Sequence, residues 1–193
     1  MPDTPTLDLS TLVDDLFRLL RLKTTPIAMQ LFERVDDMLA VPKIRRPKGT
    51  VHSHANPYWT AELYGKPILG LKESDICFSA AKLFFAYGLG NGLSFPMSVG
   101  ATVVLMAERP TPDATFKRWV DHQPTVFFGA PTGFAGMLAS PNLPKKSDVA
   151  LRLCSSAGEA LPAELGERFT RQFGVDIVDG IGSTEMLHIY LSN

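Results

Sequence analysis

The chain has 193 residues, 45% of them hydrophobic and 20% charged, which is typical of a globular protein with a single core. Its 19 basic and 20 acidic side chains nearly cancel, so no global field attracts nucleic acid or anionic lipid. The apolar stretches are too short to span a membrane, and the first residues lack the pattern of a secretory leader. We therefore expect a cytoplasmic protein with no nucleic-acid or membrane partner.

The first 45 residues form a segment with its own pattern. Leucines recur at helical spacing within residues 8–20, which predicts an amphipathic helix, and alternating large apolar side chains predict a strand at residues 27–32. This helix and strand loosely resemble the opening of a small domain family of unknown function. We expect one domain at residues 1–45 and a second one at residues 46–193.

Apolar runs and amphipathic stretches alternate after the boundary. Helices are predicted at residues 56–64, 111–122 and 163–173, and strands at residues 75–79, 100–106, 125–128, 149–154 and 175–178. The alternation favours an α/β fold, a mostly parallel sheet with flanking helices, in which ligands bind at the carboxyl ends of the strands. The run at residues 100–106 reads as a strand buried on both faces.

Isolated cysteines and histidines suggest no metal site. Cys77 and Cys154 lie far apart among apolar neighbours, which favours two reduced thiols in the core. His52 and His54 form a His-x-His pair, but no Cys, Asp or Glu at ligand spacing completes a site.

Two stretches point to ligand chemistry. Residues 179–189, Asp-Gly-Ile-Gly-Ser-Thr-Glu-Met-Leu-His-Ile, read as a polar loop that follows a strand. Its Ser183, Thr184 and Glu185 offer hydroxyls for phosphate and a carboxylate for Mg²⁺, although a turn with a capping serine is the alternative. Residues 84–91, Phe-Phe-Ala-Tyr-Gly-Leu-Gly-Asn, could line the bottom of an apolar pocket or form a core aromatic cluster.

Four motifs occur in one order: Pro-Lys-Gly-Thr-Val-His-Ser-His at residues 47–54, Phe-Phe-Gly-Ala-Pro-Thr at residues 127–132, Ser-Ala-Gly-Glu-Ala-Leu-Pro at residues 156–162, and the stretch at residues 179–189. Together they resemble the adenylate-forming acyl- and aryl-CoA ligase superfamily, and residues 84–91 with 186–189 resemble its benzoate–CoA ligase branch. The resemblance covers about residues 46–193. It implies an incomplete piece of the large N-terminal domain of such a ligase.

The resemblance implies roles for individual residues. Three residues would be catalytic: Thr184 would contact phosphate, Glu185 would bind Mg²⁺, and Lys48 matches the lysine that ends the family's phosphate loop. The implied nucleotide-binding residues are Ala157, Gly158, Glu159, Asp179, Gly180, Ser183 and Thr184. The implied aryl-acid residues are Ala86, Tyr87, Gly88, Gly182, His188 and Ile189. As a bare sequence feature, His188 is more typical of a packed or surface histidine.

The implied reaction joins an aryl acid such as benzoate to CoA through an acyl-adenylate, with ATP, Mg²⁺ and CoA as co-reactants and AMP as product. The sequence departs from the family's pattern, because residues 41–46 contain no glycine where relatives carry a Ser/Thr/Gly-rich phosphate loop. The family's ribose-binding acid, hinge and C-terminal lysine would fall after residue 193. We expect a fragment that is inactive alone. The alternative is a non-enzymatic fused or truncated remnant, or a small binding module led by residues 1–45.

The predicted helices are too few to cover both faces of such a sheet. An uncovered apolar face or sheet edge would favour association. We therefore expect possible self-association through uncovered sheet faces.

Overall fold

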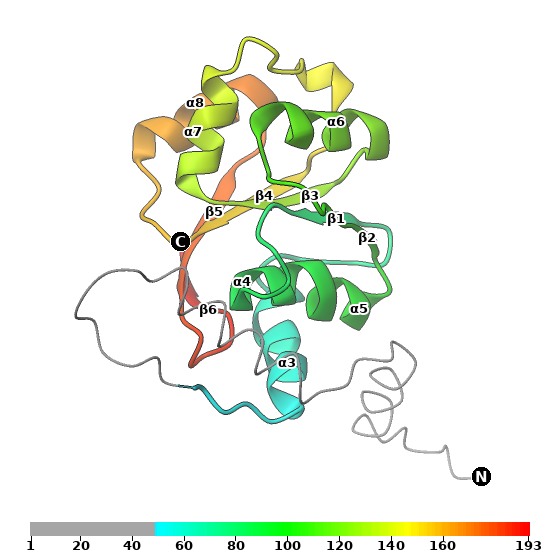
Figure 1. Cartoon of the computed structure of the whole chain (residues 1–193), viewed down its shortest axis with the longest axis vertical. Helices are drawn as coiled ribbons and strands as arrows, with labels where there is room; N and C mark the ends of the chain where they lie inside the picture. Colours follow the sequence, from blue (N-terminus) through cyan, green and yellow to red (C-terminus); the bar gives the residue numbers. More distant parts are fainter. Residues whose placement is uncertain (1–48) are drawn as a thin grey trace. The chain divides into compact units, whose positions relative to one another are not determined.

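The computed structural model describes residues 49–193 (Figure 1). Lys48, the helix expected at residues 8–20 and the strand expected at residues 27–32 lie outside the described residues. Asn56–Asn193 is one compact unit, and it contains every strand of the described part. Within the described part, no helix is long and apolar enough to cross a membrane.

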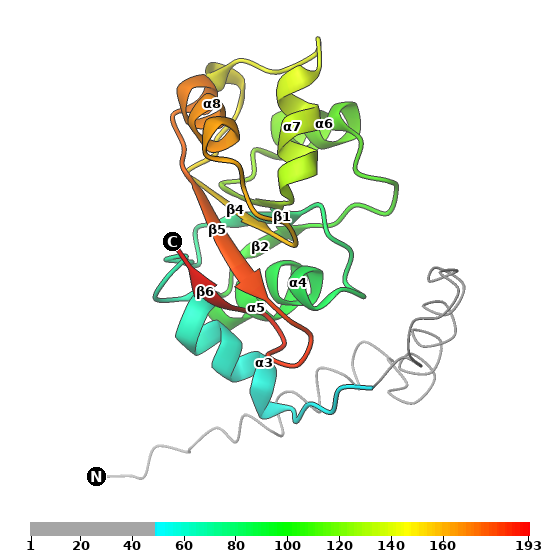
Figure 2. The same cartoon turned by 90° about the vertical axis from the view of Figure 1, so that its left-hand side faces the viewer.

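The compact unit is built on a six-stranded sheet in the order β2-β1-β3-β4-β5-β6 (Figure 1), and Figure 2 shows β6 beside β5 at one edge. The strands are β1 (Ile76–Ser79), β2 (Thr102–Val104), β3 (Val126–Gly129), β4 (Leu153–Ala157), β5 (Ile177–Gly182) and β6 (Ile189–Ser192). The first five strands pair in parallel, and β6 returns antiparallel to β5. This topology confirms the predicted α/β fold with a mostly parallel sheet.

Three regular helices cover one face of the sheet: α6 (Pro112–His122), α7 (Pro131–Ala139) and α8 (Ala163–Phe173) (Figure 1). The fully buried Trp119 of α6 packs edge-on against Phe127 of β3 and Phe173 of α8, with ring centroids 5.0 and 5.5 Å apart. Thr111 caps α6 by accepting a hydrogen bond from the amide of Ala114. This face is a closed aromatic core.

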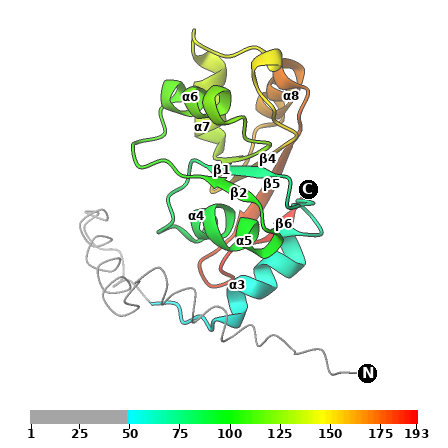
Figure 3. The same cartoon turned by 90° about the vertical axis from the view of Figure 1, so that its right-hand side faces the viewer.

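Shorter segments cover the opposite face (Figure 3). They are α3 (Ala55–Thr60), the π-helical turn η1 (Ala61–Gly65), α4 (Ala86–Leu89), the π-helical turn η2 (Gly90–Ser94) and α5 (Phe95–Val99). A 3-10 turn, η3 (Lys146–Asp148), lies between α7 and β4 in the chain. A second core packs here, with Tyr64, Phe95 and Phe128 among its buried residues.

A buried ion pair joins the amino ends of the central strands. Asp75, 1% exposed, accepts hydrogen bonds from the Arg152 guanidinium and from the Thr125 hydroxyl, the latter at 2.8 Å. Burial alone would raise the pKa of Asp75, but these bonds and one from the Lys72 amide outweigh it and hold that pKa below its ordinary value. The pair therefore ties β1, β3 and β4 together at the end of the sheet where each begins.

Several expectations about elements were wrong. The run at residues 100–106 is not a strand buried on both faces: only Thr102–Val104 is strand, it lies at the sheet edge, and Leu105 is 63% exposed. An apolar run alone cannot distinguish an edge strand from a central one. Helices α4, α5 and α7 and strand β6 were not anticipated. The loop expected from Asp179 begins later, because β5 continues through Gly182.

The helix count was therefore wrong as well, since both faces of the sheet carry helices. Apolar side chains nevertheless stay exposed on the β5–β6 pair, where Ile181, Tyr190 and Leu191 are 59%, 54% and 61% exposed. Beside this pair, residues of α8, β5 and β6 line an open cavity of about 1030 Å³. Self-association stays a prediction.

The two cysteines are confirmed as free thiols in the core. Cys77 on β1 and Cys154 on β4 are fully buried on opposite faces of the sheet. Burial raises the pKa of Cys77 to about 12 and raises that of Cys154 as well. Thiols this far from ionisation are poor nucleophiles and poor metal ligands.

Candidate functional site

A cavity of about 190 Å³ opens at the carboxyl ends of β4 and β5. Its lining comes from three separate segments: Phe85, Ala86 and Tyr87 before and in α4; Ala157 and Gly158 at the end of β4; and Gly182, Ser183, Thr184, His188 and Ile189 around the β5–β6 turn. Open α/β sheets bind ligands at this end of the strands. The structure thus brings together most of the side chains that the sequence singled out.

The aromatic loop supplies one wall. Phe85 is extended and half exposed, and its ring lies 4.5 Å from that of Phe84, so these two rings are not core residues. Tyr87 turns inward, and its hydroxyl donates to the Ser155 hydroxyl oxygen at 3.2 Å. Burial raises the pKa of Tyr87 strongly, so the phenol stays neutral and this wall carries no charge.

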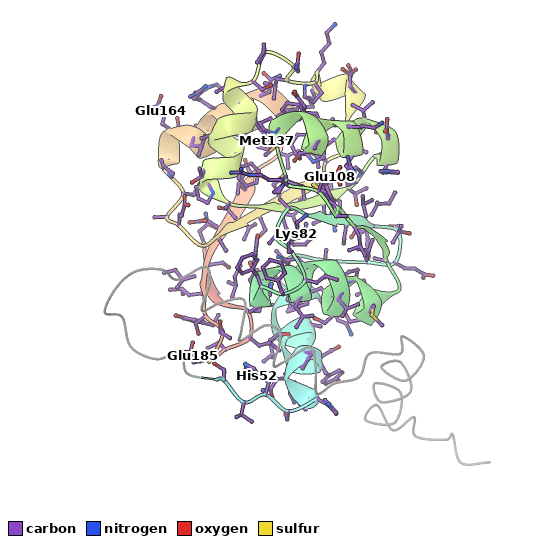
Figure 4. The ribbon with its side chains drawn as sticks, in the orientation of Figure 1. His52, Lys82, Glu108, Met137, Glu164 and Glu185 are labelled. Carbon is purple, nitrogen blue, oxygen red and sulfur yellow. The ribbon has the colours of Figure 1, made fainter. Side chains whose placement is uncertain are left out.

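Gly88 shapes the loop without lining the cavity. A side-chain carbon at this position would lie 2.0 Å from the backbone oxygen of Lys82. Lys82 is itself fixed, because its ammonium group donates to the backbone oxygens of Met106 and Glu108, both at 2.5 Å (Figure 4). The tight approach at Gly88 therefore sets the start of α4 against a rigid neighbour.

His188 forms part of the opposite wall. It is 2% exposed, and its ring lies 4.4 Å from Phe95 and 5.4 Å from Tyr87, centroid to centroid. Burial lowers the pKa of His188 to about 4, and a hydrogen bond to the Tyr87 backbone opposes that change only in part. The imidazole is therefore neutral near pH 7, and it is packed as its bare sequence context suggested.

The β5–β6 turn delivers His188 to this wall. Leu187 has a φ of 64°, an uncommon left-handed conformation for a bulky residue. The Leu187 amide donates to the Thr184 carbonyl at 3.1 Å, and the Met186 amide donates to the Ser183 hydroxyl at 3.3 Å. Glu185 is exposed on this same turn (Figure 4). The turn thus presents its carboxylate outward and its imidazole inward.

The residues assigned to the nucleotide divide into two groups. Ala157, Gly158 and Ser183 line the small cavity together with Thr184. Glu159 is exposed and accepts a hydrogen bond from the Thr132 hydroxyl at 2.6 Å, which links two of the four motifs. Asp179 and Gly180 instead line the larger cavity beside α8, and a carboxylate oxygen of Asp179 accepts from the Leu161 amide at 3.1 Å.

The described residues 49–193 contain no group of three or more His, Cys, Asp or Glu side chains able to hold a metal ion. Mg²⁺ in nucleotide sites is commonly bound by one or two carboxylates together with phosphate oxygens and water. The exposed carboxylate of Glu185, next to the Thr184 hydroxyl, fits a cation that arrives with a nucleotide.

Sequence reasoning missed three residues that hold His188 in place. Tyr64 and Phe95 pack on its ring, and the Asn91 side-chain oxygen lies 3.1 Å from its Nε2 atom. Asn91 ends the aromatic stretch at residues 84–91, and its position between two glycines was the one sequence feature that could have drawn attention to it. Nothing in the local sequence marks Tyr64 as a neighbour of a histidine so distant along the chain.

Comparison with known proteins agrees with this geometry. Residues 46–193 match the family of AMP-binding enzymes. A benzoate–CoA ligase of Thauera aromatica is 66% identical over 147 residues, covering 76% of this chain and 28% of that ligase. A 4-hydroxybenzoate–CoA/benzoate–CoA ligase of Rhodopseudomonas palustris is 53% identical over 152 residues, covering 76% of this chain and 27% of the ligase.

Solved structures give the same result. A benzoate CoA ligase from Burkholderia xenovorans superposes with a TM-score of 0.76 at 74% identity, over 76% of this chain and 30% of that one. The anthranilate CoA ligase AuaEII, in complex with anthranoyl-AMP, superposes with a TM-score of 0.73 at 43% identity, over 78% of this chain and 29% of that one. The chain spans less than a third of the length of these relatives. It belongs to the AMP-binding enzymes, the adenylate-forming ligases, on their benzoate–CoA ligase branch.

Proposed function

We propose that residues 46–193 form part of the substrate-binding core of an ATP-dependent aryl acid–CoA ligase that activates benzoate or a close relative. The single observation that carries this proposal is the 190 Å³ cavity, in which the aromatic loop, the end of β4 and the β5–β6 turn meet. Its walls are mostly apolar and hold few polar groups, as is usual for sites that bind small apolar molecules.

The charge state of the cavity favours an aryl ring over a charged or strongly polar group. Tyr87 and His188 are both neutral at physiological pH because burial disfavours their ionised forms. An aromatic ring of the substrate can pack against the rings of Phe85 and Tyr87 in offset or edge-on geometry. We propose that Ala86, Tyr87, Gly182, His188 and Ile189 surround the ring, and that Gly88 supports the loop from behind.

The nucleotide would bind beside the ring, at the ends of β4 and β5. Gly158, with a φ of 95°, lets the backbone turn away at the end of β4, and together with Ala157 and Glu159 it would border the adenine. The hydroxyls of Ser183 and Thr184 would donate to phosphate oxygens, and Glu185 would hold Mg²⁺. That cation would neutralise the phosphate charge during attack by the aryl carboxylate.

We propose that Asp179 and Gly180 act indirectly. They line the larger cavity, and Asp179 anchors the Leu161 amide just after the Ala157–Glu159 segment. Lys48 would supply a further positive charge near phosphate. These assignments carry the nucleotide part of the proposal, and ATP, Mg²⁺ and CoA are its co-reactants.

We further propose that the 193-residue polypeptide alone has no measurable ligase activity. Residues 41–46 lack glycine, so that segment cannot form the nest of backbone amides that would stabilise the transferring phosphate. Each lost donor of this kind costs about 10²–10³ in rate. An assay of AMP release from benzoate, ATP and CoA tests this part, and turnover within tenfold of a full-length relative would contradict it.

Calorimetry with benzoate tests the aryl site itself. Ala86 lines the cavity, so Ala86→Leu should fill part of it and weaken benzoate binding at least tenfold. Ala135→Leu, at an exposed position of α7, is the matched control and should leave binding unchanged. Equal affinity of the Ala86→Leu variant and the wild type, or no benzoate binding by a folded wild-type chain, would overturn the proposed site.

A further inference from the structure

Asn91 is a buried amide with no direct place in the cavity. It lies in η2, is 0% exposed, and sits among apolar and aromatic residues of the second core. Burying an amide costs free energy unless its hydrogen bonds are made. Its side-chain Oδ1 is hydrogen-bonded to Nε2 of His188 at 3.1 Å. Within residues 49–193 its amide nitrogen has no partner.

The π-helical turn η2 brings the backbone unusually close to the same ring. A side-chain carbon on Gly90 would lie 2.4 Å from Cδ2 and 2.8 Å from Nε2 of His188. Turns of this kind are rare and are frequent at functional sites. Gly90 therefore leaves space for the imidazole edge, and Asn91 then meets the nitrogen at that edge.

With the Asn91 oxygen facing the ring, these contacts favour one tautomer of His188. The Asn91 side-chain oxygen and the Tyr87 backbone both favour a proton on the ring, and the described residues give Nδ1 no partner. A histidine that donates from Nε2 keeps its lone pair on Nδ1. Because burial disfavours the doubly protonated ring, the neutral Nε2–H form is the one that these contacts stabilise.

We infer that Asn91 is a positioning residue for aryl-acid binding: it holds His188 in the Nε2–H tautomer and in a single ring orientation, which gives the cavity a fixed wall. The inference rests on the proposed function only where it concerns aryl acids. The effect of Asn91 on the imidazole is independent of any ligand.

The ionisable groups around His188 make the inference testable by pH. Tyr64 and Tyr87 face the ring at centroid distances of 5.6 and 5.4 Å, and burial raises the pKa of both phenols. The carboxylate of Asp179 acts on both phenols electrostatically. In Asn91→Asp, a carboxylate replaces the amide beside Nε2. It should keep the tautomer and raise the pKa of His188.

The experiment combines two measurements on the 193-residue chain: NMR of its histidine side chains labelled with nitrogen-15, and calorimetry of benzoate binding. The wild type and Asn91→Asp should show the Nε2–H pattern, and only Asn91→Asp should titrate near neutral pH. Asn91→Leu should give mixed tautomers and weaken benzoate binding at least fivefold. The control Asn142→Asp alters an exposed amide that bonds Asp113, and it should change neither signal.

A second pair of variants tests the geometry without touching the amide. Gly90→Ala would collide with the imidazole, whereas Gly92→Ala meets the ends of the Leu83 and Leu105 side chains, at 3.0 and 3.9 Å. Displaced His188 signals in Gly90→Ala but not in Gly92→Ala support the inference. An unchanged tautomer and benzoate affinity within twofold of wild type in Asn91→Leu would overturn it. If tautomers depend on Asn91 while the folded wild type binds no benzoate, positioning of the ring stands and the proposed function fails.

Discussion

The two faces of the sheet are covered by different kinds of structure. The face under α6, α7 and α8 uses regular helices of 9 to 11 residues and a continuous aromatic core around Trp119. The face under α4, η2 and α5 uses short turns, close glycine contacts and a buried Asn91–His188 pair. The first arrangement maximises packing. The second arrangement has less regular helices and buries polar groups, and it borders the cavity that we assign to the substrate.

Removing an aromatic side chain from the regular face should have the largest effect on stability. Trp119→Ala deletes a fully buried ring, and we expect the free energy of unfolding to fall by about 3–5 kcal/mol. Urea titration measures this change. The neighbouring Val120→Ala, at a position 47% exposed, should stay within about 0.5 kcal/mol of the wild type. A loss below about 1 kcal/mol for Trp119→Ala would show that this face does not carry the core.

The face that borders the cavity should instead make the stability of the fold depend on pH. The pKa of His188 is lowered from 6.5 to about 4 in the folded chain, so the unfolded chain binds a proton first as pH falls. Stability is therefore complete above pH 6.5 and falls as pH drops toward 4, by about 3 kcal/mol in all. Denaturation at several pH values should show this slope in the wild type and not in His188→Gln. An equal slope in both would contradict the assignment.

Removing one partner of the Asp75–Arg152 pair should affect both faces equally, because the pair joins the strands themselves. Arg152→Met leaves a buried carboxylate without its main partner, and with Arg152 partly exposed we expect a loss of about 2 kcal/mol near pH 7. The pKa of Asp75 is lowered in the folded state. The wild type should therefore lose stability as pH falls below about 4, and Arg152→Met should lose less there. Unchanged acid sensitivity in the variant would contradict this account.

The smallest expected effect concerns the strained turn. Leu187 adopts a left-handed conformation that costs a branched or bulky residue about 1 kcal/mol. Leu187→Gly should therefore stabilise the fold slightly while loosening the wall that carries His188, so that benzoate binding weakens by a few-fold. Thermal unfolding and calorimetry on one preparation measure both. Weaker folding without any change in binding would show that Leu187 serves packing alone.

The sequence predicted the regular face better than the other one. The helix at residues 163–173 appears with the same bounds, because its apolar positions repeat at helical spacing and Gly174 ends it in a left-handed conformation. Residues 86–99 contain glycines and a proline that suppress any helical pattern, so α4 and α5 were missed. Their helical form depends on tertiary contacts such as Gly90 against His188, which no local pattern encodes.

The candidate site was predictable to the extent that its motifs are contiguous. Tyr87, Ser183 and His188 came from two quoted stretches, and the sheet brings those stretches together. Asp179 was expected in the same loop, but β5 extends past it, and it lines the larger cavity. The end of a strand is the feature that sequence patterns fix least well.

The most direct test of the central claim is to map benzoate on the chain by amide chemical shifts. Residues of β5 line two cavities in the described part of the chain, and our account places the aryl acid in the one of about 190 Å³ and not in the one of about 1030 Å³. Benzoate should shift the amides of residues 85–87 and 182–189 and leave those of α6 and α8 unchanged. Shifts centred on Leu161, Thr170 and Leu191 would place the ligand in the larger cavity and contradict the account.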